Sequence, residues 1–292
     1  LESAQVLYTQ AKLHLPDRYL AFLKLRLPPY LKLILENEFP RTQISTRFGS
    51  GDAVYYGPFR SKATAELFEH EFLNLFQLRR CQEDLFPSPD HAGCIYGEMG
   101  MCLRPCQQTV SVSGYASEVN RVADFLRTDG RHFKQSAEAA RERLSTELDF
   151  EAAARQHKRV EQIEQVLKLR DELVTAVEHL HGIAITPSMD SGCVDLRFVH
   201  AGAWQHTHTF FVALSDQSVS MDRRLKDLFA TLTSLAPSFR DRQEHLAILA
   251  KWYYSSWRDG EWIGYESADR ISYRRIVGAI SRVYDSSRQS ET

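Results

Sequence analysis

The segment LSTELDFEAAARQH, residues 144–157, decides how the middle of the chain folds. It lies inside a long charged stretch, 116–178, in which apolar residues recur at helical spacing before and after it. Asp149 interrupts that pattern and is suited to be a helix N-cap, because its carboxylate can accept hydrogen bonds from the first free N–H groups of the next helix. Glu151 then lies where the positive end of the helix dipole favours a negative charge. The segment therefore predicts an antiparallel helical hairpin over 116–178, with its tip at Leu148 and Asp149.

Shorter elements are predicted on both sides of the helical hairpin. Residues 42–48 and 53–59 are strand-like and are separated by Gly-Ser-Gly-Asp, so they predict a β-hairpin. Apolar and polar residues alternate over 182–214, which predicts a β-meander. Helical periodicity predicts further helices at 3–26, 61–78, 221–258 and 270–284. The predicted fold class is α+β, dominated by helices, with small β-hairpin and meander elements and a protruding helical hairpin.

The bulk composition is that of an ordinary globular protein. The 292 residues are 43% hydrophobic and carry 36 basic against 38 acidic side chains, so the net charge of −2 gives no global argument for nucleic-acid binding. No run of 18 apolar residues occurs, which predicts no membrane span. The opening Leu-Glu-Ser-Ala does not resemble a signal peptide. Five cysteines are an odd number and too sparse for a secreted disulfide framework. We expect a cytoplasmic protein.

Four of the five cysteines are concentrated in a loop that contains proline and glycine. Cys81, Cys94, Cys102 and Cys106 follow the pattern C-x12-C-x7-C-x3-C, while Cys193 stands apart in a predicted strand. Four thiolates can bind one soft metal ion or a [4Fe–4S] cluster. Only the last pair has a spacing typical of zinc sites. The spacing alone leaves open zinc, an iron–sulfur cluster, and free buried thiols without a metal.

Three arginines flank the cysteines, namely Arg79, Arg80 and Arg104. Arginine is a frequent ligand of nucleic-acid phosphate, so these three are the candidates for DNA contact. The alternative is ordinary solvated surface charge.

The order of the motifs resembles the UvrC family of DNA-repair excinuclease proteins. The matching segments are Tyr-Tyr-Gly-Pro-Phe at 55–59, Leu-Arg-Arg-Cys at 78–81, Cys-Ile-Tyr at 94–96, Cys-Leu-Arg-Pro-Cys at 102–106, and Leu-Asp-Phe-Glu-Ala-Ala-Ala-Arg at 148–155. The last of these is similar to the core of the UVR domain, and the predicted strands after 193 resemble those that follow it. The resemblance covers roughly residues 25–215.

The resemblance implies partners, a cofactor and residue roles. A UVR hairpin pairs with the matching hairpin of UvrB, and the residues placed to do so are Leu148, Phe150, Glu151, Ala153, Ala154 and His157. The cysteines of the family are associated with a [4Fe–4S] cluster, which favours iron–sulfur over zinc at Cys81, Cys94, Cys102 and Cys106. Zn²⁺ remains the alternative cofactor. DNA is the second expected partner.

The cutting machinery of the family is not recognised in this chain. Only the tail of a GIY-YIG nuclease domain would fit in residues 1–35, and the metal-binding glutamate of that domain aligns with Leu7 or Tyr8. Neither residue supplies the oxygen ligands that a hard cation prefers. An RNase H-like site needs several converging carboxylates, whereas the acids near the C-terminus are predicted on solvated helix faces. Those acids are Asp222, Asp227, Asp241 and Glu244. We therefore assign no catalytic residue.

Five regions are expected along the chain. They are a GIY-YIG-like remnant (1–35), a UvrC-like region with the cysteines (36–115), the UVR-type hairpin (116–178), the β-meander (179–215) and a helical C-terminal region (216–292). The first hypothesis is a UvrC-like excision-repair protein that binds a UvrB-type partner and DNA without cutting. The second is an incision protein of the same family whose nuclease domain lies upstream. The third is a UVR-containing adaptor of a protein-quality-control machine that responds to a metal or to redox state.

Overall fold

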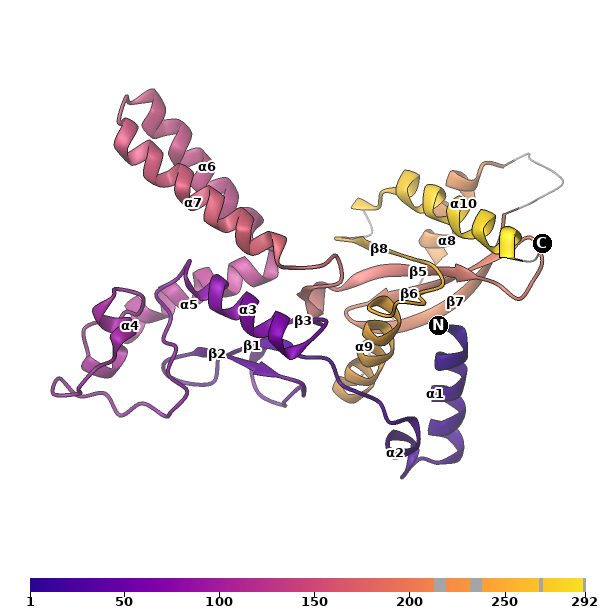
Figure 1. Cartoon of the computed structure of the whole chain (residues 1–292), viewed down its shortest axis with the longest axis horizontal. Helices are drawn as coiled ribbons and strands as arrows, with labels where there is room; N and C mark the ends of the chain where they lie inside the picture. The colour runs from indigo at the N-terminus through magenta and orange to yellow at the C-terminus, as the bar shows by residue number, and fades with distance from the viewer. Residues whose placement is uncertain (213–218, 232–237, 268–269, 291–292) are drawn as a thin grey trace. The chain divides into compact units, whose positions relative to one another are not determined.

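The computed structural model describes residues 1–212, 219–231, 238–267 and 270–290 (Figure 1). It divides into two compact units, one formed by residues 28–177 and the other by residues 1–27 together with 178–292. The α+β fold class is confirmed, because helices predominate in both units and each unit contains one small antiparallel sheet. None of the described helices is long and apolar enough to cross a bilayer.

The unit formed by residues 28–177 is built on a four-stranded sheet with the order β2-β1-β3-β4. Its strands are β1 (Tyr30–Ile34), β2 (Arg41–Ser45), β3 (Ala53–Gly57) and β4 (Thr175–Ala176). Its helices are α3 (Lys62–Leu73), α4 (Ile95–Glu98), α5 (Val112–Arg127), α6 (Arg131–Thr146) and α7 (Phe150–Lys168), with a 3-10 turn at Pro105–Gln107.

The predicted β-hairpin between residues 42–48 and 53–59 is wrong. The strands β2 and β3 do not pair with each other; both pair with β1, so that Leu33 lies opposite Thr42 on one side and opposite Val54 on the other. The sequence prediction omits strand β1, a short apolar run in which the alternate residues Leu31 and Leu33 are fully buried. Because β1 occupies the centre of the sheet, its two neighbours are separated by a strand width.

An aromatic cluster joins this sheet to its helices. Tyr56 of β3 stacks on Phe68 of α3 with ring centroids 5.3 Å apart, and Phe68 stacks on Phe72 at 5.7 Å. Phe72 meets Phe125 of α5 edge-on at 5.2 Å. Each buried aromatic side chain of this kind contributes on the order of 2 kcal/mol through apolar burial. The core therefore fixes α3 and α5 against the sheet, and α5 in turn supports the base of α6 and α7.

The helical hairpin is confirmed as α6 and α7, which run side by side (Figure 1). It is shorter than the predicted span, since residues 112–127 form the separate helix α5 and Thr175–Ala176 form β4. Gly130 makes the turn from α5 to α6 with φ of 71°, and a Cβ there would lie 2.9 Å from the Phe125 ring. Glycine therefore suits both the backbone conformation and the close approach.

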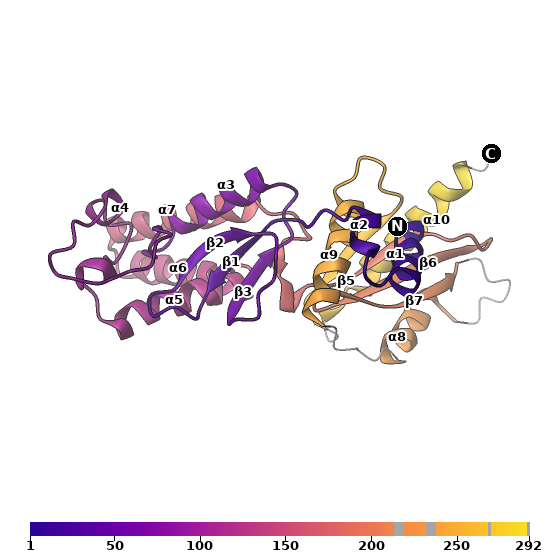
Figure 2. The same ribbon diagram turned by 90° about the horizontal axis from the view of Figure 1, so that it is seen from below.

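The other unit contains the β-meander, which is confirmed. Its sheet has the order β7-β6-β5-β8 and is antiparallel throughout, with β5 (His181–Pro187), β6 (Cys193–His200), β7 (Ala203–Phe211) and β8 (Glu261–Tyr265). Its helices are α1 (Glu2–His14), α2 (Tyr19–Leu23), α8 (Met221–Thr231), α9 (Phe239–Tyr253) and α10 (Tyr273–Ser290), which Figure 2 shows from a second direction. Buried residues of α8 and α10 share one core with the sheet.

The C-terminal region is not only helical. Residues 261–265 form β8, whose Trp262 and Ile263 are buried and which pairs with β5. The N-terminal residues 1–27 belong with this unit, whereas β1 belongs with the other. The chain passes from one unit to the other after residue 27 and returns after residue 177.

Candidate functional site

The turn between α6 and α7 is built by two capping motifs that follow one another. The N–H of Leu148 donates to the carbonyl of Ser145 at 3.1 Å, and the N–H of Asp149 donates to the carbonyl of Leu144 at 3.0 Å. This pair of bonds is a Schellman motif, which ends α6. The Asp149 carboxylate then accepts from the N–H of Ala152 at 3.0 Å, so the predicted N-cap of α7 is confirmed.

The turn holds a bulky apolar residue in a conformation that favours glycine. Leu148 has φ of 63°, a left-handed backbone that costs a side-chain-bearing residue about 1–2 kcal/mol. Its side chain is 70% exposed, and the neighbouring Phe150 is 66% exposed. Two large apolar side chains therefore project into solvent at a strained turn, a combination that often marks a functional surface.

The remaining predicted partner-binding residues lie on the same end of α7. Glu151, Ala154 and His157 are exposed, and Ala153 is half-buried. The buried residues of α7 begin one turn further on, at Val160. The first two turns of α7 are thus free of the core contacts that hold its second half.

The four clustered cysteines lie in the segment between α3 and α5. Cys102 and Cys106 are buried, Cys81 is half-buried and Cys94 is exposed as the N-cap residue of α4. The N–H of Arg104 donates to Cys102 Sγ at 3.3 Å, and Arg79 Nη1 lies 3.5 Å from Cys81 Sγ. All four are free thiols, as is the isolated Cys193, which is buried in β6 as predicted for a packing residue.

The cysteine side chains are near enough to influence one another's charge. Burial raises the pKa of Cys102 to about 11, and the charges of Cys81, Cys94 and Cys106 add to the rise. Burial likewise raises the pKa of the Cys106 thiol, with contributions from Cys81 and Cys94. A cation held between these sulfurs would relieve their repulsion and displace their protons.

The donor set fits a soft metal or an iron–sulfur cluster better than a hard cation, because all four donors are sulfur. In the described part of the chain, however, no group of three or more His, Cys, Asp or Glu side chains is arranged to hold a metal ion. The loop therefore gathers ligands of the right kind without holding them at ligating distances.

The three flanking arginines have different surroundings. Arg79 is only 3% exposed, and its guanidinium donates to the carbonyls of Phe39 and Glu83, each at 2.8 Å. It braces the start of the cysteine loop, and its predicted contact with DNA does not fit this burial. Arg80 is half-buried, donating to Asn74 at 2.9 Å and lying over the Tyr96 ring. Arg104 is exposed.

One of the C-terminal acids is buried and does not lie on a solvated helix face as predicted. Glu244 is 3% exposed and not solvated: Tyr8 and Tyr19 donate to its two carboxylate oxygens at 2.7 Å each, and Arg240 binds it at 3.0 Å. Its charge is thus neutralised by a local network, so Glu244 has a structural role. Leu7, the other position aligned with the family's metal-binding glutamate, is half exposed on α1.

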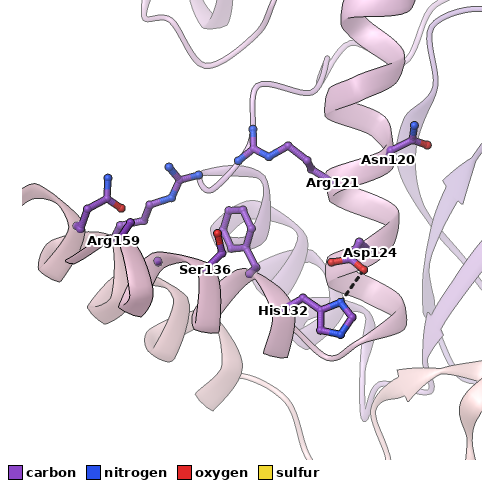
Figure 3. A pocket seen from close by; sticks show the side chains of 10 residues that line it. Asn120, Arg121, Asp124, His132, Ser136 and Arg159 are labelled. Carbon is purple, nitrogen blue, oxygen red and sulfur yellow. Dashed lines mark hydrogen bonds and ion pairs between the residues drawn. The ribbon is translucent and has the colours of Figure 1, made fainter. Parts of the chain in front are cut away.

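Sequence reasoning also missed a hollow of about 580 Å³ between α5, α6 and α7. Figure 3 shows Arg121 and Arg159 reaching toward each other from α5 and α7, with Ser136 of α6 beneath them. In a charged helical stretch each arginine has the pattern of a solvated surface residue. Only the packing of three helices brings the two together, so no local signal reveals the hollow.

Comparison with known proteins places these features in context. The family "UvrC/Cho excinuclease, middle domain" matches residues 29–125, a span that contains the sheet strands β1 to β3, α3 and the four cysteines. The UvrABC system protein C of Moorella thermoacetica is 26% identical over 235 residues, which cover 77% of this chain and 37% of that protein. That of Rickettsia bellii is 27% identical over 174 residues, covering 60% of this chain and 27% of the relative.

The similarity is therefore to a part of larger proteins. The chain spans 37% of the length of the Moorella relative and 27% of the Rickettsia relative. No solved structure matches the chain.

Proposed function

Since this chain is a UvrC-like family member, we propose that it serves nucleotide excision repair by binding a UvrB-type partner and DNA, without cutting DNA itself. The observation that carries the proposal is the exposed apolar pair at the α6–α7 tip, Leu148 and Phe150. Exposed aromatic and aliphatic side chains on a rigid scaffold are typical centres of protein interfaces.

The tip is well suited to a partner that presents a similar hairpin. The Schellman motif and the Asp149 cap hold the turn in one conformation, so little entropy is lost when a partner binds. Glu151 and Arg155 lie beside the apolar pair and supply opposite charges at its rim. A partner hairpin with an apolar centre and complementary rim charges would match this surface.

The experiment compares Phe150→Asp with the control Phe22→Asp in binding to purified UvrB. Phe22 is 58% exposed on α2, so the control places the same charge on a similarly exposed phenylalanine of the other unit. We expect Phe150→Asp to weaken binding at least tenfold, because it buries a charge in the interface. Equal affinities for wild type and Phe150→Asp would overturn the proposed surface, and binding to a chaperone or kinase in place of UvrB would favour the adaptor hypothesis.

The second part of the proposal concerns the cysteine loop. Cys81, Cys94, Cys102 and Cys106 would bind a [4Fe–4S] cluster as thiolates, with Zn²⁺ as the alternative. Support comes from the all-sulfur donor set and the mutual influence of the thiols. The cluster would cross-link a loop that has few regular elements, and the exposed Arg104 beside it would meet DNA phosphate.

The absence of cutting by this chain is supported by the residues at the aligned metal position. Leu7 carries no ligating atom, and the Tyr8 hydroxyl donates to Glu244. An incision assay with UvrB, damaged duplex and Mg²⁺ or Mn²⁺ tests this part. We expect no cleavage, and cleavage by the purified chain would favour the incision hypothesis.

A further inference from the structure

The hollow between α5, α6 and α7 contains an excess of hydrogen-bond donors. Its polar lining comes from Asn120, Arg121, His132, Ser136, Gln156 and Arg159, together with one acid, Asp124. All lie in the unit formed by residues 28–177, and the aromatic core beneath α5 holds the walls in place. A volume of about 580 Å³ is in the range of small-molecule sites.

The charges around the hollow leave one cation without a carboxylate in hydrogen-bond or ion-pair contact. Arg121 binds Glu118 at 2.5 Å, and His132 Nδ1 lies 3.1 Å from Asp124 Oδ1. Arg159 makes no hydrogen bond or ion pair with any residue that the structure describes. The two carboxylates near the hollow are therefore already engaged, and the guanidinium of Arg159 remains available to an anion.

A phenylalanine ring orients the two arginines. The Phe133 ring centroid lies 5.4 Å from the guanidinium carbon of Arg121 and 4.9 Å from that of Arg159. Burial lowers the pKa of Arg159 and the charge of Arg121 lowers it further, while the charge of Glu118 offsets part of this shift. Two cations are thus held near one aromatic ring although they repel each other, and an anion between them would remove that repulsion.

We propose that this hollow is a phosphate-binding site in which Arg121 and Arg159 hold the phosphate oxygens and the Ser136 hydroxyl donates a further hydrogen bond. Guanidinium groups match phosphate through paired N–H donors, and two of them converge here from different helices. The hollow is larger than a bare phosphate, so it has room for the attached sugar of a nucleotide. The phosphate comes either from a nucleic-acid strand or from a free nucleotide; only the strand source rests on the DNA binding proposed above.

The test uses the full chain and two probes, inorganic phosphate and a single-stranded oligodeoxythymidine. Phosphate is titrated while the arginine side-chain N–H resonances are followed by NMR, and oligonucleotide binding is measured at several salt concentrations. The variants are Arg159→Gln, Arg159→Lys and the control Arg143→Gln, which changes an arginine of α6 that is 71% exposed and does not line the hollow. Circular dichroism verifies that each variant is folded.

We expect phosphate to shift the Arg159 and Arg121 resonances, and the Arg121 shift to vanish in Arg159→Gln. For the oligonucleotide, the slope of log affinity against log salt should fall by about 0.7 in Arg159→Gln, stay near wild type in Arg159→Lys, and be unaffected by the control. Phosphate shifts with unchanged oligonucleotide binding would keep the site and assign it to a free nucleotide. Absence of phosphate shifts in the folded wild-type chain would overturn the site, whatever becomes of DNA binding.

Discussion

Tyr8 and Glu244 are 236 positions apart in the sequence, and the Tyr8 hydroxyl donates to Glu244 Oε2 at 2.7 Å. Both side chains are buried, and Tyr19 donates to the second carboxylate oxygen at the same distance. Burial alone would raise the pKa of Glu244, but the hydrogen bonds from Tyr19, Tyr8 and Arg240 outweigh it and hold that pKa below its ordinary value. This contact fastens α1 to α9.

Replacing Glu244 should destabilise the unit formed by residues 1–27 and 178–292. In Glu244→Gln one carboxylate oxygen becomes an amide donor that faces hydroxyl and guanidinium donors, so we expect a loss of about 2 kcal/mol in the free energy of unfolding at pH 7. A carboxyl with a lowered folded-state pKa stabilises above its unfolded pKa of about 4.3 and loses that effect as the pH falls through the folded value. The gap between wild type and variant, measured by urea unfolding, should therefore narrow below about pH 4. The control Asp227→Asn changes an exposed acid of α8 and should cost little; an equal loss in both variants would contradict the role of the network.

His245 should make the same unit sensitive to mild acid. Burial lowers the pKa of His245 to about 4, and its Nδ1 accepts from the N–H of Trp204 at 3.2 Å. Because the unfolded chain binds the proton at about pH 6.5, stability is retained above that pH and falls between about 6.5 and 4, by up to about 3 kcal/mol. His245→Asn keeps an acceptor and should flatten the stability curve in this window. His181, whose pKa burial also lowers to about 4, and His200, whose pKa burial lowers as well, should contribute the remaining slope. The exposed His14→Asn is the control, and an unchanged slope in His245→Asn would show that the buried imidazole is not responsible.

Which features could be predicted depends on how local their causes are. The α6–α7 turn was predictable because its stop signal and cap lie within a few residues, from Leu144 to Ala152. The cysteine spacing was equally visible, and the matched family covers it. The order of the motifs indicates the matched family without any knowledge of contacts, because each motif is a short local segment.

Other features depend on distant partners and left no local pattern. Strand β1 was missed because five residues carry little periodicity, and its central place follows from pairing with both β2 and β3. Glu244 has the spacing of a solvated helix face, but Tyr8 and Tyr19 from the other end of the sequence bury it. Arg121 and Arg159 likewise become a site only when three helices pack.

The cysteine loop should bind a cluster that depends on its buried pair. After anaerobic reconstitution we expect about four iron and four sulfide per chain and visible charge-transfer absorption. Both should be lost in Cys102→Ser/Cys106→Ser and retained in Cys193→Ser, which removes the isolated buried thiol of β6. Stoichiometric zinc without colour would show that the cofactor is Zn²⁺ and not the iron–sulfur cluster. A chain that binds neither iron nor zinc would contradict the proposed centre.

Arg104 should contribute to DNA affinity through charge. Its side chain is exposed next to Cys102 and Cys106, whereas Arg79 is buried, so only the former is free to meet a phosphate. Arg104→Gln should weaken duplex binding similarly for all sequences and reduce the salt slope by about 1. Fluorescence anisotropy at several salt concentrations measures both. Arg143→Gln, which changes an arginine 71% exposed on α6, is the control; if it lowers the slope as much as Arg104→Gln does, the effect is general electrostatics and not a contact at the cysteine loop.

Leu148 should show opposite effects on stability and on partner binding. Leu148→Gly relieves the left-handed backbone at φ of 63° and should raise the free energy of unfolding by up to about 1 kcal/mol, since glycine adopts that conformation without steric cost. The same change deletes an exposed apolar side chain from the tip and should weaken UvrB binding severalfold. Ala201→Gly is the matched control, because Ala201 has φ of 47° in the other unit and should gain stability without changing partner affinity. Chemical unfolding and calorimetric titration give the two quantities. If Leu148→Gly were more stable and still bound UvrB as tightly as wild type, the strained leucine would have no role in docking, and Phe150 alone would have to account for the interface.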